Sequence, residues 1–460
     1  MTEDTIAAIA TPIGEGGLAV IRLSGPDAVA IAERSFSAGG RNGTKLSTAP
    51  SHTIHFGHIV RDGQQIDEVL ASVMRAPKTF TREDVVEVTC HGGILPAKLV
   101  LDALLANGAR MAEPGEFTRR AFLNGRIDLA QAEAVADLIH SRTELALRAA
   151  NEQLAGKLSE RINRLRDEMM QTLAHVEAHI DFPDEDIAPD TQAQLLSRLE
   201  RGVAFMDELL RTANEGQILR RGIRTAIVGR PNAGKSSLLN QLLGRDRAIV
   251  SPVPGTTRDT IEETANIRGL PVVFIDTAGL REARDEIEQE GIRRSRESLE
   301  QAELILQVVD VSQPLTATDR EYFDEFATKK RIIVLNKSDV ISSGQRSVVS
   351  GHLPNSTMVA TSCVTGQGIE ALKDSIKQLV WSGEIKAEML QVMINSRHQN
   401  ALDRAREAAL RTIDAMRKKL TLELVALDLR IAVNAVGEIV GKTTTEDLLD
   451  SIFSQFCIGK

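Results

Sequence analysis

The sequence predicts a multidomain protein in which an α/β domain of the Ras-like P-loop type is inserted into an all-α helical domain, after an N-terminal α+β domain. Three observations carry this prediction. A phosphate-binding loop lies between a strand pattern and a helix pattern, amphipathic helical patterns lie on both sides of it, and short strands with turn signals fill the first hundred residues. A competing arrangement, two separate helical bundles, stays open at this point.

Length and composition limit the classes of protein to consider. A chain of 460 residues with 42% hydrophobic residues is expected to form about three domains. Its net charge is −9, and aromatic residues make up only 3%, which does not favour a stacking platform for single-stranded nucleic acid. Cys90, Cys363 and Cys457 are too far apart for metal-binding spacing, and so low a count suits a reducing cytoplasm. No run of about 18 uncharged apolar residues occurs, so we expect no membrane span.

The expected boundaries divide the chain into four segments. The N-terminal domain covers 1–118, the first helical segment 119–218, the phosphate-binding domain 219–380 and the second helical segment 381–460. In the first segment, strand patterns are followed by a hairpin signal at Arg61-Asp62-Gly63. Arg22 and Glu87 lie in otherwise apolar strands, where a charge is usually on the solvated face. The turns at 14–17 and 91–93 are interpreted as glycine turns and not as ligand loops.

Helical patterns flank the phosphate-binding domain. Asp128 and Gln131 have the spacing of a capping box. One apolar stripe of a long helix recurs at steps of three and four residues, and we expect it to be core: Leu154, Leu158, Ile162, Leu165, Met169, Leu173, Val176 and Ile180. A further helix is expected at about 192–215, with Gly216 near its end, and another at 398–420. The residues Leu420, Leu424, Leu427, Ile431 and Ala435 form a second stripe.

The phosphate-binding loop runs from Gly229 to Ser236 and has the spacing G-x-x-x-x-G-K-S. Residues 223–228 before it are typical of a buried strand, and 237–243 after it of a helix. Glycines allow backbone N–H groups to approach a phosphate closely, and the helix N-terminus adds a positive dipole. Lys235 can reach the β- and γ-phosphates, and the Ser236 hydroxyl can hold Mg²⁺.

Three later motifs follow in the order expected of a nucleotide-binding domain. Thr257 offers a second hydroxyl to Mg²⁺, and a buried strand ends in Asp276-Thr277-Ala278-Gly279, where the carboxylate can act on the Mg²⁺ shell. The sequence 336–339, Asn-Lys-Ser-Asp, follows another strand. A carboxylate there can accept two hydrogen bonds from guanine, whereas adenine would leave it unpaired at a cost in free energy. The sequence therefore predicts specificity for GTP.

One departure concerns the residue that positions the attacking water. Ras-like GTPases place Gln after Asp-x-x-Gly, and Leu280 stands there in this chain. Glu282, Asp285, Glu286 and Glu288 follow closely, and spacing does not choose among them. Arg258 and Arg281 are candidates for an arginine finger, and a partner or a metal ion could supply the positive charge instead.

Taken together, these motifs resemble those of the tRNA-modification GTPases called MnmE or TrmE. The resemblance covers essentially the whole chain. It rests on the motifs already quoted, on the sequences at 4–6, 22–25, 114–124, 128–134 and 255–259, and on the tail Phe456-Cys457-Ile458-Gly459-Lys460.

The resemblance implies a folate-binding, dimer-forming N-terminal domain, a helical domain and an inserted G domain, in a cytoplasmic protein. It implies a homodimer that works with an FAD-containing partner, MnmG (GidA), in a heterotetramer or a larger complex. The pair would add an aminomethyl or carboxymethylaminomethyl group at C5 of the wobble uridine, position 34, of tRNA. The one-carbon unit would come from 5,10-methylenetetrahydrofolate, with 5-formyltetrahydrofolate as an alternative ligand.

The resemblance also implies roles for single residues. Arg22, Glu87, Arg126 and Lys460 match the folate contacts, and Asn232, Ser251, Val253 and Thr256 match a loop that holds K⁺. Glu288 matches the carboxylate that orients water, Lys235 is the second catalytic candidate, and Cys457 is a further one whose alternative is a packed thiol. The expected nucleotide contacts are Asn232, Ala233, Gly234, Lys235, Ser236, Ser237, Ser251, Thr256, Thr257, Asp276, Thr277, Ala278, Gly279, Asn336, Lys337, Asp339 and Ser362.

Two other functions compete with this expectation. A ribosome-assembly or RNA-binding regulatory GTPase has the same G domain, but it typically adds an RNA-binding module, and the C-terminal part here is helical and amphipathic. A membrane ion transporter with a G domain is excluded by the lack of membrane-spanning segments.

Overall fold

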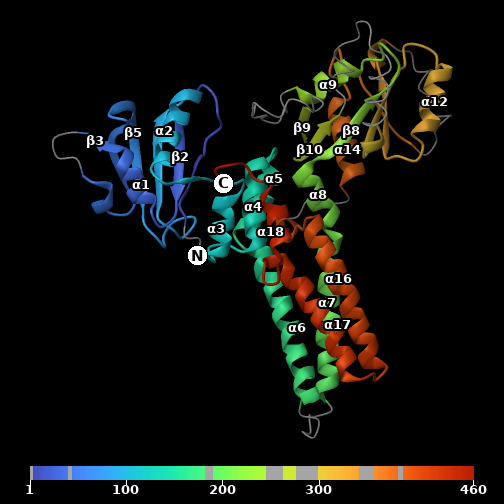
Figure 1. Ribbon diagram of the computed structural model, residues 1–460. Helices are drawn as coiled ribbons and strands as arrows, with labels where there is room; N and C mark the ends of the chain where they lie inside the picture. The colour runs from blue at the N-terminus through green and yellow to red at the C-terminus, as the bar shows by residue number, and fades with distance from the viewer. Residues whose placement is uncertain are drawn as a thin grey trace.

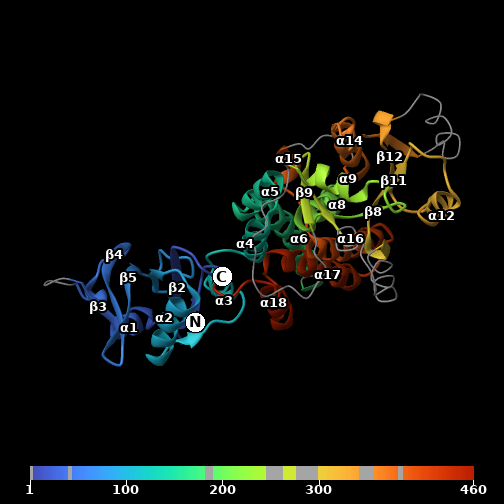
Figure 2. The same cartoon turned by 90° about the horizontal axis from the view of Figure 1, so that it is seen from above.

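The computed structural model describes residues 4–39, 44–181, 190–244, 263–275, 299–340, 356–381 and 387–460. An N-terminal sheet domain, an elongated helical domain and a second sheet domain follow one another in space (Figures 1 and 2). Both ends of the chain lie where the N-terminal domain meets the helical domain. Among the described helices, none is long and apolar enough to cross a membrane.

The N-terminal domain is a seven-stranded sheet in the order β3-β4-β5-β6-β2-β1-β7, with antiparallel neighbours except for the parallel pair β1–β7. Apolar side chains of α1 and α2 join those of the sheet in one core. The elements are β1 (Ile6–Ile9), β2 (Leu18–Ser24), α1 (Ala28–Ser35), β3 (Phe36–Ala38), η1 (Leu46–Thr48), β4 (Thr53–Arg61), β5 (Gln64–Met74), β6 (Val85–His91), α2 (Ile94–Ala106) and β7 (Arg110–Met111).

The hairpin turn predicted in this domain is confirmed. Asp62 and Gly63 join β4 to β5 with φ of 52° and 75°, as a two-residue hairpin turn requires. A Cβ on Gly92 would lie 2.2 Å from the carbonyl oxygen of Gly16. The two glycine turns therefore pack against each other, and this close approach requires glycine at position 92.

The helical domain is one bundle assembled from both flanks of the second sheet domain. A single apolar cluster contains residues from 130–213 and from 392–440, so the alternative of two separate bundles is wrong. Its elements are α3 (Glu116–Leu123), α4 (Leu129–His140), α5 (Glu144–Leu154), α6 (Lys157–Asp181), α7 (Asp190–Arg211), α8 (Ala213–Arg221), α16 (Ser396–Arg417), α17 (Leu422–Val440) and α18 (Glu446–Phe453).

Of three local predictions in the helical domain, the structure confirms the capping box and contradicts the single-helix stripe and the helix end at Gly216. The capping box at the start of α4 is confirmed: Asp128 accepts a hydrogen bond from the Gln131 N–H, and Gln131 accepts one from the Asp128 N–H. The first stripe is not one helix, because the chain turns at Gly156 with φ of 86° and leaves Leu154 at the end of α5. Gly216 does not end a helix but lies inside α8, where its Cβ would come within 2.4 Å of the Ile394 carbonyl oxygen.

The second stripe is largely outside the core. Leu420, Leu424, Leu427 and Ile431 are 46%, 50%, 57% and 44% exposed, whereas Ala435 is buried. The opposite face of α17 fills the bundle core instead. The spacing predicts the helix correctly but does not tell which of two apolar faces is covered.

The second sheet domain has the order β13-β12-β11-β8-β10-β9, and every neighbouring pair is parallel except β10–β9. Its strands are nearly continuous runs of buried residues, as helices on both faces require. Its elements are β8 (Ile223–Val228), α9 (Lys235–Leu243), β9 (Glu263–Ile267), β10 (Leu270–Phe274), β11 (Leu304–Asp310), α12 (Ala317–Glu325), β12 (Arg331–Asn336), η2 (Ser338–Val340), β13 (Thr357–Ala360) and α14 (Ile369–Val380), and α15 (Ala387–Leu390) leads back to the bundle.

Candidate nucleotide site and folate site

The loop between β8 and α9 has the backbone shape that its glycines permit. Gly229 has φ of 149°, and a Cβ there would lie 2.4 Å from the Val308 carbonyl oxygen. Gly234 has φ of 98°, and its Cβ would lie 2.1 Å from the Asn336 side-chain nitrogen. Both approaches exclude a side chain, so the loop passes closely over β11 and beside the end of β12.

Lys235 lies in the first turn of α9 and points back into this loop. Its Nζ donates to the carbonyl oxygens of Gly229 and Arg230, both at 2.9 Å. Burial lowers the pKa of Lys235 below its usual value. The ammonium is therefore only partly solvated, which strengthens its attraction to phosphate oxygens.

Residues 336–339, at the end of β12, contact the phosphate loop. The buried Asn336 donates from Nδ2 to the Ala233 carbonyl oxygen at 2.9 Å and accepts from the Cys363 N–H at 3.3 Å. Lys337 has φ of 64°, and its Nζ donates to Asp310 Oδ2 at 2.6 Å. Burial would raise the pKa of Asp310, but hydrogen bonds from Lys337 and Ser312 outweigh it and hold that pKa below its usual value. Asp339 follows in η2 and is exposed, so its carboxylate is accessible to a base.

The loop after β13 joins the same edge of the sheet. Ser338 donates its N–H to the Thr361 carbonyl oxygen at 3.0 Å, and Ser362 accepts at Oγ from the Thr365 N–H at 3.2 Å. Gln241 of α9 donates to the Cys363 carbonyl oxygen at 2.8 Å. Loops after three parallel strands thus meet at their carboxyl ends, where open α/β sheets bind ligands.

The structure brings together part of the predicted nucleotide site. Asn232, Ala233, Gly234, Lys235, Ser236 and Ser237 lie in or just after the phosphate loop, beside Asn336, Lys337, Asp339 and Ser362. Other predicted residues lie outside the described part of the chain: Ser251, Val253, Thr256, Thr257, Asp276, Thr277, Ala278, Gly279 and Glu288. Strand β10 ends at Phe274, just before Asp276 in the chain, and pairs with β8.

Three of the four predicted folate residues lie together between the N-terminal sheet and the C-terminal tail. Arg22 of β2 donates from Nε to Glu87 Oε1 of β6 at 2.8 Å, as their paired register allows. Its Nη1 donates to the Gly459 carbonyl oxygen at 3.2 Å. Burial and the nearby Arg22 charge lower the pKa of Lys460. A partly buried cluster of both signs results, suited to a polar ligand with a carboxylate.

The remaining residues of this site are placed differently. Arg126 is exposed and lines a hollow with Asn163 and Lys442, and no described hydrogen bond or ion pair joins it to Arg22, Glu87 or Lys460. Cys457 is exposed, so the alternative of a packed thiol is wrong. Sequence reasoning missed Phe117, whose ring centroid lies 5.7 Å from the Arg22 guanidinium carbon. No local signal pairs these two residues, because they belong to different elements.

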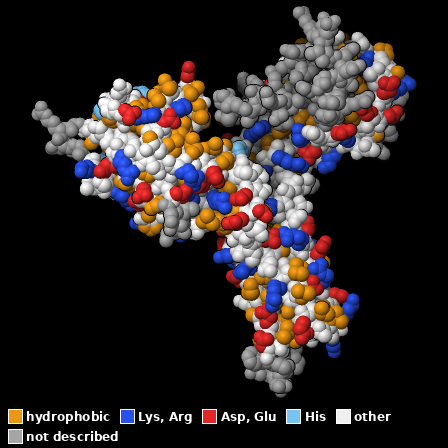
Figure 3. Space-filling view, viewed as in Figure 1, with side chains coloured by type: hydrophobic (Ala, Val, Ile, Leu, Met, Phe, Trp, Pro, Cys, Tyr) orange, Lys and Arg blue, Asp and Glu red, His pale blue; other side chains and the backbone are white. Residues whose placement is uncertain are grey.

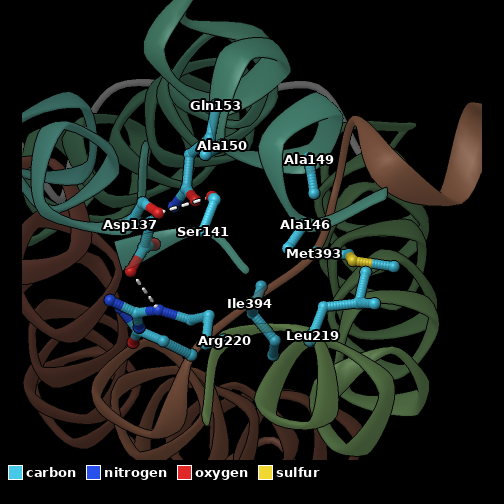
Figure 4. Close-up of a pocket in the computed structure, with 12 residues that line it drawn as sticks. Asp137, Ser141, Ala146, Ala149, Ala150, Gln153, Leu219, Arg220, Met393 and Ile394 are labelled. Atoms are coloured by element: carbon cyan, nitrogen blue, oxygen red, sulfur yellow. Dashed lines mark hydrogen bonds and ion pairs between the residues drawn. The ribbon is translucent and has the colours of Figure 1, made fainter. Parts of the chain in front are cut away.

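A small cavity lies where the helical domain meets the second sheet domain (Figure 4). It is about 30 Å³ in volume, room for one or two water molecules. Ser141 donates to the Asp137 carbonyl oxygen at 2.6 Å, and Arg220 donates to Asp137 Oδ1 at 2.6 Å across its polar side. Ala146 and Met393 line its apolar side. The cavity is too small for a substrate, and its polar groups join α4 to α8.

Comparisons with known proteins cover the whole chain. Residues 5–126 match the model described as "GTP-binding protein TrmE N-terminus", and residues 129–457 match that of the "MnmE helical domain". The chain is 49% identical to the tRNA modification GTPase MnmE of Geobacillus thermodenitrificans and 48% identical to that of Listeria welshimeri, with 100% of each chain covered in both alignments. Among solved structures, the G domain of the T. maritima FeoB iron transporter is 28% identical, over 34% of this chain and 98% of that chain, with a TM-score of 0.26.

Proposed function

The chain belongs to the MnmE family of tRNA modification GTPases, and from this membership we propose that it binds GTP on the loop after β8 and uses its hydrolysis in tRNA modification. One observation carries the proposal. The phosphate loop and the guanine-type motif 336–339 are hydrogen-bonded to each other through Asn336 and Ala233. Residues at a single edge of the sheet can therefore bind both the phosphates and the base of one nucleotide. We also propose that the domain boundaries of the chain lie near residues 118, 218 and 380.

The chemistry on tRNA is the finer part of the proposal. With an FAD-containing partner of the MnmG type, the protein adds an aminomethyl or carboxymethylaminomethyl group to C5 of the wobble uridine. A reduced folate, 5,10-methylenetetrahydrofolate, supplies the carbon. The cluster of Arg22, Glu87, Gly459 and Lys460 supports this, because a donor guanidinium and a carboxylate side by side match the edge of a pterin ring and its acidic tail. Three unpaired cysteines support a reducing, cytoplasmic setting.

The test is mass spectrometry of nucleosides from bulk tRNA of cells with and without this gene. We expect C5-aminomethyl-type wobble uridines to disappear and to return with the wild-type gene. An unchanged nucleoside profile would contradict the proposal and favour the alternative, a ribosome-assembly GTPase.

Asp339→Asn is expected to lower GTP affinity at least about 100-fold, because the amide cannot accept both guanine hydrogen bonds. The same variant should gain affinity for xanthosine triphosphate, whose base carries an acceptor where guanine carries the 2-amino group. Fluorescence titration with both nucleotides measures the change. Glu325→Gln on α12 serves as a charge-matched control, and unchanged GTP affinity in Asp339→Asn would remove this residue from the base site.

Oxygen donors suit the two ions that the proposal includes. Ser236 lies exposed at the start of α9 beside the phosphate loop, and in the proposal its hydroxyl holds Mg²⁺ with Thr257. Asn232 is exposed at φ of 61° and presents an amide oxygen to K⁺, with Ser251, Val253 and Thr256. Among the described residues no group of three or more His, Cys, Asp or Glu could hold a metal ion. In this proposal Glu288 orients the attacking water, and Cys457 is a candidate for the folate chemistry.

Potassium is expected to accelerate GTP hydrolysis at least about tenfold over sodium, because a cation against the phosphates supplies the charge that an arginine finger supplies elsewhere. Initial rates in KCl and NaCl at equal ionic strength measure this. Asn232→Ala should lose the potassium effect, and equal rates of the wild type in both salts would contradict the ion-assisted model.

Arg22→Ala is expected to weaken binding of 5-formyltetrahydrofolate about 10- to 100-fold, since it removes a charged donor and leaves Glu87 unpaired. Isothermal calorimetry measures the affinity, with the exposed Arg61→Ala as a control on the same sheet. Binding as tight as that of the wild type would remove Arg22 from the site. Arg126→Ala, measured in parallel, decides whether that exposed side chain belongs to it.

A homodimer through the N-terminal domain is also proposed. Ile54, Phe56 and Leu70 are 67%, 51% and 44% exposed, and Phe56 lies opposite Leu70 on neighbouring strands. An apolar sheet face of this kind is typical of an interface. Phe56→Asp is expected to give monomers in sedimentation velocity, and a dimer that survives it would contradict this face. The heterotetramer with the FAD-containing partner would build on this dimer.

A further inference from the structure

Helix α17 is apolar on two opposite faces, and the structure covers only one. Over its 19 residues it carries four charged side chains, Glu423, Asp428, Arg430 and Glu438. Val425, Leu429, Val433 and Val436 are buried in the bundle core. The other face carries what we call the α17 stripe, Leu420 from the preceding turn with Leu424, Leu427 and Ile431, all at least 44% exposed. A contiguous apolar stripe that stays exposed on a helix is typical of an interaction surface.

Within the described part of the chain, the side chains beside the stripe are engaged in pairs of their own. On one edge Asp428 accepts a hydrogen bond from Arg411 of α16 at 2.8 Å, and on the other Arg430 pairs with Glu177 of α6. These pairs hold the neighbouring side chains beside the stripe and not over it. Figure 3 shows hydrophobic side chains between charged ones on this lower part of the helical domain.

The order of the stripe is palindromic, with spacings of four, three and four residues. A second copy of the stripe running antiparallel therefore presents the same spacing. Leu424 then lies opposite Leu427 of the second copy, and Leu420 opposite Ile431, as in the alternating layers of an antiparallel coiled coil. Spacings of three and four residues keep Leu424, Leu427 and Ile431 on one face of the helix.

Charges at the edges suit the same arrangement. Glu423 and Arg430 each precede a stripe residue by one position, so they lie on the same edge of the helix. In an antiparallel pair, residues of that edge face each other, so Glu423 lies opposite Arg430 of the second copy twice around the two-fold axis, and Arg430 is shared between Glu423 of that copy and Glu177 of its own chain. Asp428 on the other edge meets Thr421, so no like charges are opposed. Among the described residues, no ion pair involves Glu423 within its own chain.

We propose that the α17 stripe is a self-association surface, on which a second copy of this chain docks antiparallel through its own stripe. This interface is distinct from the sheet face of the N-terminal domain and does not depend on the proposed tRNA chemistry. With it, two N-terminal dimers can join into a tetramer or a longer assembly. Four side chains from each copy make a small interface, so we expect a dissociation constant on the order of 100 µM. A membrane surface is less suited to the stripe, because Glu177, Glu423 and Asp428 would face anionic lipids.

Sedimentation velocity of the full chain tests the proposal, from about 1 to about 300 µM to span the expected affinity. It is run in the wild-type background and in the Phe56→Asp background. In the first the stripe gives a dimer–tetramer step, and in the second a monomer–dimer step. If Phe56→Asp leaves the dimer intact, the N-terminal interface is wrong, but the dimer–tetramer step still reports on the stripe. Leu427→Asp should abolish the concentration-dependent step in both backgrounds, and Glu208→Arg, an exposed change on α7, should leave it unchanged.

Charge reversal identifies the partner as a second copy. Glu423→Arg alone and Arg430→Glu alone should each weaken association about tenfold, because each opposes like charges across the axis. An equimolar mixture of the two variants should associate like the wild type, since every Arg then meets a Glu. A mixture that does not recover would overturn the antiparallel pairing. A wild type that shows no concentration-dependent step would also overturn it. Binding to vesicles of equal phosphatidylglycerol and phosphatidylcholine is measured in parallel. The proposal is overturned as well if Leu427→Asp loses vesicle binding but keeps the association step.

Discussion

Lys235→Ala is expected to lower kcat/KM for GTP hydrolysis by about 100- to 1,000-fold, the usual effect of removing one charged group that stabilises a transition state. The ammonium is held inside the phosphate loop by two carbonyl oxygens at 2.9 Å, and burial lowers its pKa. Alanine removes the positive charge from the loop and leaves those two carbonyl oxygens without their donor.

Steady-state hydrolysis and titration with a fluorescent GTP analogue separate turnover from binding. Lys330→Ala, an exposed change on the same domain, serves as the control and should match the wild type. Circular dichroism should show that Lys235→Ala is folded. Hydrolysis within a factor of three of the wild type would contradict the assignment of the phosphate site. In cells, Lys235→Ala should fail to restore the modified wobble uridines.

Arg120→Ala is expected to destabilise the protein by about 3–5 kcal/mol, the range for breaking a buried ion-pair network from one side. Arg120 is only 2% exposed, and its guanidinium donates to Asp4 Oδ1 at 2.8 Å and to Glu116 Oε1 at 3.0 Å. It also donates to Glu83 at 3.3 Å. One side chain thus joins the start of the chain, the sheet domain and α3. Its removal leaves the buried Glu116 carboxylate, and those of Glu83 and Asp4, with fewer partners.

Chemical denaturation followed by circular dichroism measures this loss as a shift of the first transition. The neighbouring Arg119→Ala is the matched control, because Arg119 is 28% exposed and its partner Asp450 is 63% exposed, so we expect less than about 1 kcal/mol. Equal shifts for the two variants would contradict a special role for the buried arginine.

The same network has a defined pH dependence. Burial would raise the pKa of Glu116, but hydrogen bonds from Arg110, from the Glu113 N–H and from Arg120 outweigh it, so the folded pKa lies below the ordinary 4.5. A carboxyl with a lowered pKa stabilises the fold fully above its unfolded pKa and loses that contribution as the pH falls through the folded value. We therefore expect the stability difference between wild type and Arg120→Ala to shrink below about pH 4.5.

The sequence predicted the contiguous features well. The hairpin turn at Asp62-Gly63, the capping box at Asp128 and the strand–loop–helix at Gly229 to Lys235 all have the expected geometry. Each depends on backbone angles and hydrogen bonds among residues a few positions apart. The resemblance to a family predicted that Arg22, Glu87, Arg126 and Lys460 share a site, and the structure brings Arg22, Glu87 and Lys460 together.

Helix ends and helix faces were predicted less well. Leu154 belongs to a different helix from the rest of its stripe because Gly156 turns the chain, and Gly216 is needed for close approach to Ile394 and not for a helix end. Periodicity reports that a face is apolar, but burial depends on what other parts of the chain lie against it.

The sequence by itself determined the phosphate loop, the base motif, the order of strands and helices and the family, because these depend on short-range chemistry along the chain. Only the tertiary structure decided three other features. It brought Gly459 to Arg22 across 437 residues, it set Asn336 against the phosphate loop, and it left the α17 stripe exposed. These depend on long-range packing, in which each element competes for the faces of the others, and no local pattern records the outcome.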